Sequence, residues 1–172
     1  MTDRNLIPTL ATSRLTLRPF APTDDSRLHQ IMNEPGIMRY FPRTDPPDIQ
    51  RVQGLIERQF MQWREYNLGW WAVIPHGGAE LIGWNGLQYL AETGEVEVGY
   101  LLSRQFWGQG YATEGAKVSL NFGFEKLKLK EIIGLTHPEN IASQNVLKKC
   151  GMKYSEKKEY FGMQLFRFSL QH

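Results

Sequence analysis

QFWGQGYATEG, residues 105–115, contains three glycines and two glutamines and lies between segments of different periodicity. Polar and apolar residues alternate before it, as in a strand, whereas Ala112, Ala116, Leu120 and Phe124 follow at intervals of four, as in a helix. The first turn of a helix has backbone N–H groups without helical partners, and the helix dipole adds positive character there. Glycines let the preceding backbone approach a ligand closely. The stretch therefore predicts a phosphate-binding turn.

The pattern also narrows the kind of phosphate ligand. No Gly-Lys-Ser/Thr of a nucleotide-binding P-loop occurs in the chain, and a dinucleotide fingerprint would need glycine where Thr113 stands. The strands before the turn are joined by short glycine turns, HGG at 76–78 and ETG at 92–94, which favour an antiparallel meander over a parallel βαβ unit. After these two motifs are excluded, the phosphate-binding pattern is Gln-x-x-Gly-x-Gly-x-Ala over residues 105–112, with Arg104 as the cation of the loop.

The rest of the chain predicts a mixed α/β domain spanning residues 1–172. Strands are expected at 14–20, 69–75, 80–90, 95–103 and 131–138, and two more at the end of the chain. Helices are expected at 23–33, with Thr23 and Asp24 as caps, at 46–66, after Gly110, and at 140–150. The order is β, α, α, three β, α, β, α, β, β.

Composition excludes several classes of protein. A chain of 172 residues with 41% hydrophobic content is expected to form one packed core. Net charge +2 and a pI of 8.7 disfavour a nucleic-acid partner, and no segment approaches the ~20 apolar residues of a membrane span. Cys150 is the single cysteine, which suggests a cytoplasmic setting, and the four histidines lack metal-ligand spacing, so no metal is expected.

Three stretches together resemble the GNAT-type N-acetyltransferases, and among them the RimJ/RimL-like ribosomal-protein branch. They are TSRLTLRPF at 12–20, EVEVGYLLSRQFWGQGYATEG at 95–115 and HPENIASQNVLKKCGM at 137–152. The resemblance implies a mostly antiparallel sheet of six to seven strands flanked by about four helices. It also implies direct transfer of an acetyl group from acetyl-CoA to a primary amine, in a complex that holds both substrates.

The resemblance implies where acetyl-CoA lies. Backbone amides from Gln105 to Ala112 would hold the pyrophosphate, and the pantetheine arm would lie between strands 95–103 and 131–136. The implied cofactor-binding residues are Leu101, Leu102, Gln105, Trp107, Gly108, Gln109, Gly110, Tyr111, Ala112, Thr113, Asn140 and Ser143. A glycine turn without a ligand, and Asn140 as an ordinary helix N-cap, are the structural alternatives.

Two residues are candidates for catalysis. Glu97 matches the acidic position that relatives use as a base, often through water; the alternative is an ordinary solvated or ion-paired strand glutamate. Glu95 lies on the same strand face about 7 Å away, a spacing that also suits an inverting glycosidase but leaves the glycine turn unexplained. Relatives often protonate the leaving thiolate with a tyrosine, but Leu147 occupies that position, so Ser143 is expected to donate instead. Cys150 is expected to be a buried apolar group without a catalytic role.

The acceptor is less defined by sequence. An α-amine with a pKa near 8 is easier to deprotonate at pH 7 than a lysine near 10.4, so we expect a protein N-terminal α-amine, with a small-molecule amine or a non-catalytic acyl-CoA-binding module as alternatives. Tyr40, Phe41, Trp84 and Tyr100 are the expected acceptor-binding residues, although aromatic residues most often pack in cores. A monomer or homodimer is expected.

Overall fold

The computed structural model describes residues 7–172, which form an eight-stranded sheet in the order β1-β2-β3-β4-β5-β6-β8-β7. The strands are β1 Leu10–Ala11, β2 Leu15–Arg18, β3 Trp70–Pro75, β4 Gly83–Leu90, β5 Glu95–Leu102, β6 Glu131–Thr136, β7 Lys153–Tyr160 and β8 Met163–Gln171. The predicted mixed, mostly antiparallel architecture is confirmed. The sheet has one strand more than predicted, because β1 is only two residues long and too short to show any periodicity.

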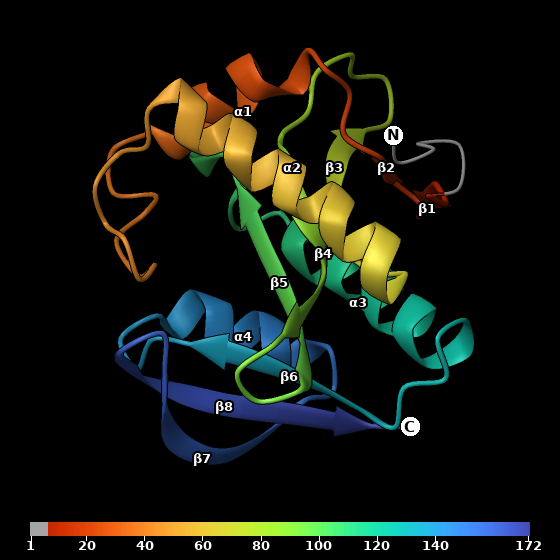
Figure 1. Cartoon of the computed structure of the whole chain (residues 1–172), viewed down its shortest axis with the longest axis vertical. Coiled ribbons are helices and arrows are strands. Elements are labelled where there is room, and N and C mark those ends of the chain that lie inside the picture. Colours follow the sequence, from red (N-terminus) through yellow and green to blue (C-terminus); the bar gives the residue numbers. More distant parts are fainter. Residues whose placement is uncertain (1–6) are drawn as a thin grey trace.

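The sheet consists of two parts that meet at one point. β3, β4 and β5 form the predicted antiparallel meander, and β6, β8 and β7 form a second antiparallel set. Between them, β5 and β6 run parallel and pair in register only at Glu97 and Ile133. Beyond that pair the two strands diverge, so that the sheet opens like a V (Figure 1).

Helices cover both faces of the sheet. α1 (Asp24–Met32) and α2 (Ile49–Tyr66) lie on one face, and α3 (Tyr111–Glu125) crosses the other as the connection from β5 to β6 (Figure 1). α4 (Ile141–Lys149) follows β6 and covers the second part of the sheet. Side chains on the two faces of the sheet pack into two different hydrophobic cores. Val98 and Leu102 of β5 pack in the core that contains α3, whereas Leu101 packs in the core that contains α1 and α2.

The starts of the first two helices differ in how they are capped. Asp48 caps α2, a cap that the sequence pattern did not identify: its Oδ1 accepts a hydrogen bond from the Arg51 N–H at 2.8 Å, and the helix begins at Ile49 instead of at residue 46. Thr23 stands at the N-cap of α1 but makes no side-chain cap bond, so the prediction of a capping side chain there is wrong. Asp24 instead accepts from the Ala21 N–H and pairs with Arg18, both at 2.7 Å. No helix within residues 7–172 is long and apolar enough to cross a membrane.

Candidate active site

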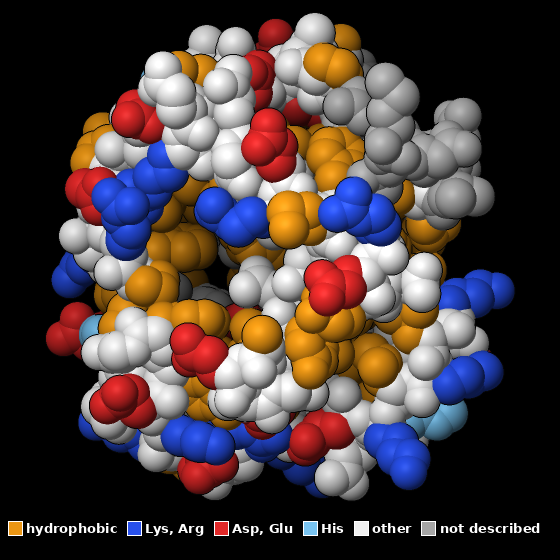
Figure 2. All heavy atoms as spheres, viewed as in Figure 1, with side chains coloured by type: hydrophobic (Ala, Val, Ile, Leu, Met, Phe, Trp, Pro, Cys, Tyr) orange, Lys and Arg blue, Asp and Glu red, His pale blue; other side chains and the backbone are white. Residues whose placement is uncertain are grey.

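A cavity of about 800 Å³ occupies the region where β5 and β6 separate. Its walls come from the loop between α1 and α2, from β3, β4 and β5, from the turn before α3, from the loop into α4, and from the hairpin between β7 and β8. Figure 2 shows a hollow on this face of the molecule with hydrophobic side chains around it. The cavity therefore adjoins both parts of the sheet and the glycine turn.

The turn before α3 has the backbone form that the sequence predicted. Gly108 and Gly110 adopt φ angles of 71° and 83°, in the left-handed region that favours glycine. Gly110 is the N-cap of α3 and contributes no side-chain cap. None of the backbone N–H groups of residues 108–113 donates a hydrogen bond to another described residue. Because these donors stand at a helix N-terminus beside the cavity, the turn fits a diphosphate.

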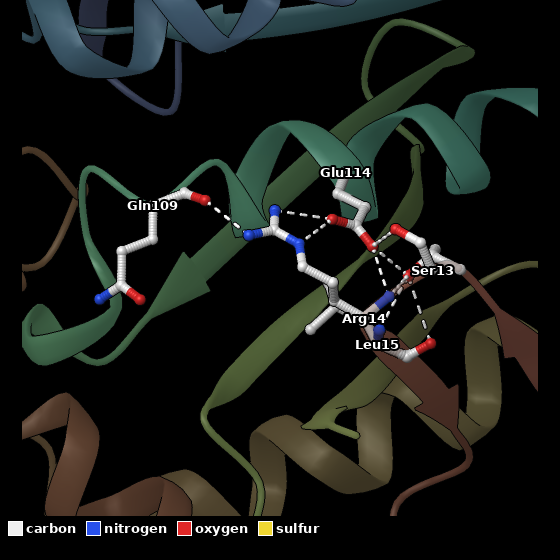
Figure 3. Close-up of polar contacts among 6 residues, drawn as sticks. Ser13, Arg14, Leu15, Gln109 and Glu114 are labelled. Carbon is white, nitrogen blue, oxygen red and sulfur yellow. Dashed lines mark hydrogen bonds and ion pairs between the residues drawn. The ribbon is translucent and has the colours of Figure 1, made fainter. Parts of the chain in front are cut away.

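An ion pair between Arg14 and Glu114 holds this turn in place (Figure 3). The Arg14 guanidinium donates to both Glu114 Oε2, at 2.7 Å, and the carbonyl oxygen of Gln109, at 3.0 Å. The hydroxyls of Thr12 and Ser13 and the Arg14 N–H donate to Glu114 Oε1. Burial by itself would raise the pKa of Glu114, but these hydrogen bonds bring it down to about 2, so the carboxylate stays charged.

Sequence reasoning missed Arg14 as a second cation of the loop. It is separated from Gln109 by 95 residues, so no local pattern connects the two. Arg104, the loop cation that the sequence did identify, lies over the Trp107 ring at 5.6 Å from its centroid, while its Nη1 donates to the Pro35 carbonyl at 2.6 Å. The Glu34 carboxylate accepts from the Ser103 hydroxyl and the Arg104 N–H. These bonds join the α1–α2 loop to the start of the glycine turn.

Glu97 lies at the point where the two parts of the sheet meet, and its side chain lines the cavity. Burial raises its pKa to about 8, although a hydrogen bond from the Leu135 backbone opposes the shift. Glu95 is different: burial is outweighed by hydrogen bonds from Tyr160 and Arg167, which hold its pKa below the ordinary value. Only one carboxyl of the pair lines the cavity, so the two do not form a glycosidase pair.

Ser143 lies across the cavity near the start of α4. Asn140 is the N-cap of α4, its Oδ1 accepting from the Ser143 N–H at 3.1 Å, which confirms the capping role. The Tyr100 hydroxyl lies 3.0 Å from Ser143 Oγ and 3.2 Å from the Ser143 carbonyl oxygen. Burial raises the pKa of Tyr100, so its hydroxyl keeps its proton. The structure thus places Tyr100 with Ser143, on the side of the cavity formed by α4.

Most of the residues expected to bind acetyl-CoA line this cavity. The exceptions are Gln105 and Gln109, which bond to each other within the turn, the Gln109 side chain donating to the Gln105 carbonyl at 2.8 Å. Tyr40, Phe41 and Trp84 line it too. Leu147 is 1% exposed and brings no hydroxyl to the cavity. The lining residues from the expected cofactor set are Leu101, Leu102, Trp107, Gly108, Gly110, Tyr111, Ala112, Thr113, Asn140 and Ser143.

Two other kinds of chemistry lack a site in this region. Cys150 does not line the cavity, and burial raises the pKa of its thiol to about 11, so it is protonated at neutral pH. Among residues 7–172, no group of three or more histidine, cysteine, aspartate or glutamate side chains is placed to hold a metal ion. Among the polar groups that line the cavity are the Glu97 carboxyl, the Ser143 and Tyr100 hydroxyls and the backbone of the turn.

Comparison with known proteins identifies the class. Residues 14–153 match the acetyltransferase (GNAT) domain family. An FsC-acetyl coenzyme A-N(2)-transacetylase of Aspergillus fumigatus is 32% identical over 162 residues, which cover 87% of this chain and 66% of that protein. A solved acetyltransferase of Agrobacterium tumefaciens superposes with a TM-score of 0.86 at 26% identity, covering 96% of this chain and 95% of that one.

A RimL ribosomal L7/L12 alpha-N-protein acetyltransferase, solved in complex with coenzyme A, has a TM-score of 0.79 over 96% of this chain and 97% of its own. At 14% identity, that likeness shows the shared fold. The fold and the family match together define an acetyl-CoA-dependent acetyltransferase. The chain belongs to the GNAT acetyltransferase family.

Proposed function

We propose that the protein transfers the acetyl group of acetyl-CoA to the α-amine of a protein or peptide N-terminus. The observation that carries this proposal is the Glu97 carboxyl, which lines the cavity with a pKa raised to about 8. A base is most effective when its pKa lies near the operating pH, and an α-amine titrates near 8. The two groups are therefore matched, whereas a lysine amine near 10.4 would need more than two further pKa units of help.

In the proposed reaction the amine nitrogen attacks the acetyl carbonyl carbon. A C–N bond forms and the C–S bond breaks, so that coenzyme A leaves as a thiolate. Glu97 accepts the proton that the amine loses, directly or through water. Ser143 donates a hydrogen bond to the thiolate sulfur, and the Tyr100 hydroxyl 3.0 Å away orients the serine. The amides of residues 108–113 hold the diphosphate of acetyl-CoA.

A small-molecule amine is the second candidate for the acceptor. The Aspergillus relative is named as an N(2)-transacetylase of FsC, so a GNAT chain of this similarity can have an acceptor that is not a ribosomal protein. We also propose a cytoplasmic setting and a monomer or homodimer.

Release of coenzyme A thiol, measured with acetyl-CoA and a panel of amines, separates these candidates. The panel contains peptides that differ in their first residue, the same peptides with blocked N-termini, and small amines. Release with free but not blocked peptides supports the proposal, and release with small amines alone supports the second candidate. Heat of coenzyme A binding in calorimetry, without release of thiol by any amine of the panel, contradicts both candidates.

A further inference from the structure

The sheet face that carries Glu97 also carries two tryptophans. Gln88 of β4 pairs in register with Glu97, and Trp84 lies four residues earlier on the same strand. Trp70 of β3 pairs with Gly86, between those two positions. Residues two apart in a strand share a face, and directly paired residues do as well. Trp70, Trp84 and Glu97 therefore project from the same side of the sheet, toward the α1–α2 loop.

The indoles of Trp70 and Trp84 stack face to face beside Glu97 and together form a slab two rings thick. Their ring centroids are 3.6 Å apart and their planes differ by 6°. Gly99 makes room for this slab, because a Cβ at that position would stand 3.2 Å from the Trp84 ring. Gly99 follows Glu97 by two residues on β5, so the Trp84 ring lies against the strand directly next to the proposed base. Both tryptophans line the cavity.

Other elements complete an apolar wall around this slab. Ile37, Tyr40 and Phe41 line the cavity from the α1–α2 loop, and Phe161 and Leu165 line it from the β7–β8 hairpin. Phe161 is 44% exposed, so a large apolar side chain stands at the mouth without being packed into a core. The half of the cavity away from the glycine turn is thus hydrophobic on several sides.

Charge in the lining is sparse. Of the described residues that line the cavity, Glu97 and Glu139 are the acidic ones. Glu139 is exposed on the loop into α4, where its carbonyl oxygen accepts from the Tyr40 hydroxyl at 3.4 Å, so its carboxyl stands at the solvent-exposed rim. Away from the rim, the hydrophobic half holds one carboxyl, Glu97, and the reaction itself uses that carboxyl as a base. A second ammonium group on a substrate would lose its water in this half without gaining an anionic partner.

From the indole slab, the apolar mouth and the single carboxyl, we propose that the acceptor is a monoamine whose amino group is borne on an apolar or aromatic body. This inference rests on the proposed acetyl transfer and names its substrate class. Such an acceptor stacks its body on Trp70 and Phe161 and directs its one amine to Glu97. Polyamines and aminoglycosides, which carry several ammonium groups, are rejected.

The test compares kcat/KM for 2-phenylethylamine, for a tripeptide that begins with phenylalanine, for a tripeptide that begins with aspartate, and for spermidine. We expect phenylethylamine or the phenylalanine peptide to exceed spermidine and the aspartate peptide by about 10- to 200-fold, the range that small apolar groups give in a hydrophobic pocket. A higher kcat/KM for phenylethylamine identifies a free amine as the acceptor, and a higher kcat/KM for the phenylalanine tripeptide identifies a peptide. Equal rates, or a preference for spermidine, overturn the inference and leave acetyl transfer intact. No release with any amine instead removes the proposed function.

Two variants of the β7–β8 hairpin sharpen this test. Phe161→Ser should lower the preference for phenylethylamine over ethylamine about tenfold, because it removes an aromatic surface at the mouth. Tyr154→Ser is the matched control: Tyr154 is an aromatic residue of the same hairpin, 52% exposed, that does not line the cavity. It should leave the preference unchanged. An unchanged preference in Phe161→Ser, or an equal loss in the control, contradicts the proposed contact.

Discussion

The Glu97 carboxyl is half-buried in the cavity wall. The raised pKa that results from this burial sets the expected pH dependence of the reaction. With a pKa of about 8, most of the group is protonated at pH 7, so activity should rise with pH up to about 8. Glu97→Gln should reduce kcat by about 10² to 10³ at pH 7. The deficit should shrink above pH 8, where the amine loses its proton unaided. A deficit that is the same at every pH would indicate a structural role for Glu97.

The raised pKa of Glu97 also makes the stability of the fold depend on pH. The folded pKa of about 8 lies above the ordinary glutamate value of 4.5, so the folded protein binds more protons than the unfolded chain between these two pH values. Stability should therefore fall as pH rises from 4.5 through 8, and Glu97→Gln should remove that fall. We expect the variant to gain up to about 5 kcal/mol over the wild type at pH 9, since each pKa unit corresponds to about 1.4 kcal/mol, and little at pH 5. Thermal unfolding of the ligand-free protein at both pH values checks this.

Ser143 and Tyr100 should act as one unit because their hydroxyls are 3.0 Å apart. Ser143→Ala should lower kcat about tenfold without changing the affinity for acetyl-CoA, since one hydrogen bond to the departing thiolate is lost. Tyr100→Phe should lower kcat by a smaller factor, and should have no further effect when Ser143 is already alanine. A double-mutant cycle on kcat measures this coupling. Additive losses would show that the tyrosine does not act through the serine.

At the scale of elements, local patterns predicted most of what the structure contains. The four-residue spacing after Gly110, the helical pattern within residues 46–66 and the glycine turns are properties of neighbouring residues, and α3, α2 and the meander follow from them. The Glu97 position is also part of a local motif. The contacts of Arg14 with Gln109 and of Tyr100 with Ser143 depend on the register of distant strands and on helix docking, so one sequence without its fold cannot reveal them.

The Arg14–Glu114 ion pair, which we call the clamp, offers a test because its positioning role and its charge predict opposite changes in coenzyme A affinity. Glu114 secures Arg14 and the loop before α3, but its negative charge also lies near the proposed diphosphate site. Glu114→Gln removes that charge, so electrostatics alone would tighten coenzyme A binding. If the clamp positions the turn, the variant should weaken binding instead, by about 3- to 10-fold for the loss of hydrogen bonds to a charged group. Calorimetry with coenzyme A decides between the two signs, with Glu139→Gln, which removes another carboxylate of the cavity lining on the loop into α4, as the control for charge alone.

At the scale of the whole molecule, the two parts of the sheet share one register pair in the backbone, so side chains must hold their junction together. Arg167 of β8 does so. Its guanidinium bonds to Glu95 of β5 at 2.9 Å and to Glu131 of β6 at 3.1 Å, and Tyr160 of β7 donates to the other oxygen of Glu95 at 2.8 Å. This network closes the narrow end of the V next to Glu97.

Removal of Arg167 should therefore affect both stability and chemistry. Arg167→Met leaves the partly buried carboxylate of Glu95 without its cation, which should lower the free energy of unfolding by about 1 to 3 kcal/mol. Glu95 already raises the pKa of Glu97 by repulsion, so losing Arg167 should move the pH midpoint of activity above 8. Adding Glu95→Gln removes the uncompensated charge and should bring both the stability and the midpoint part of the way back. Denaturant unfolding and pH–rate profiles of the three proteins measure this. A midpoint that stays fixed while stability falls would show that the network supports the fold without influencing the base.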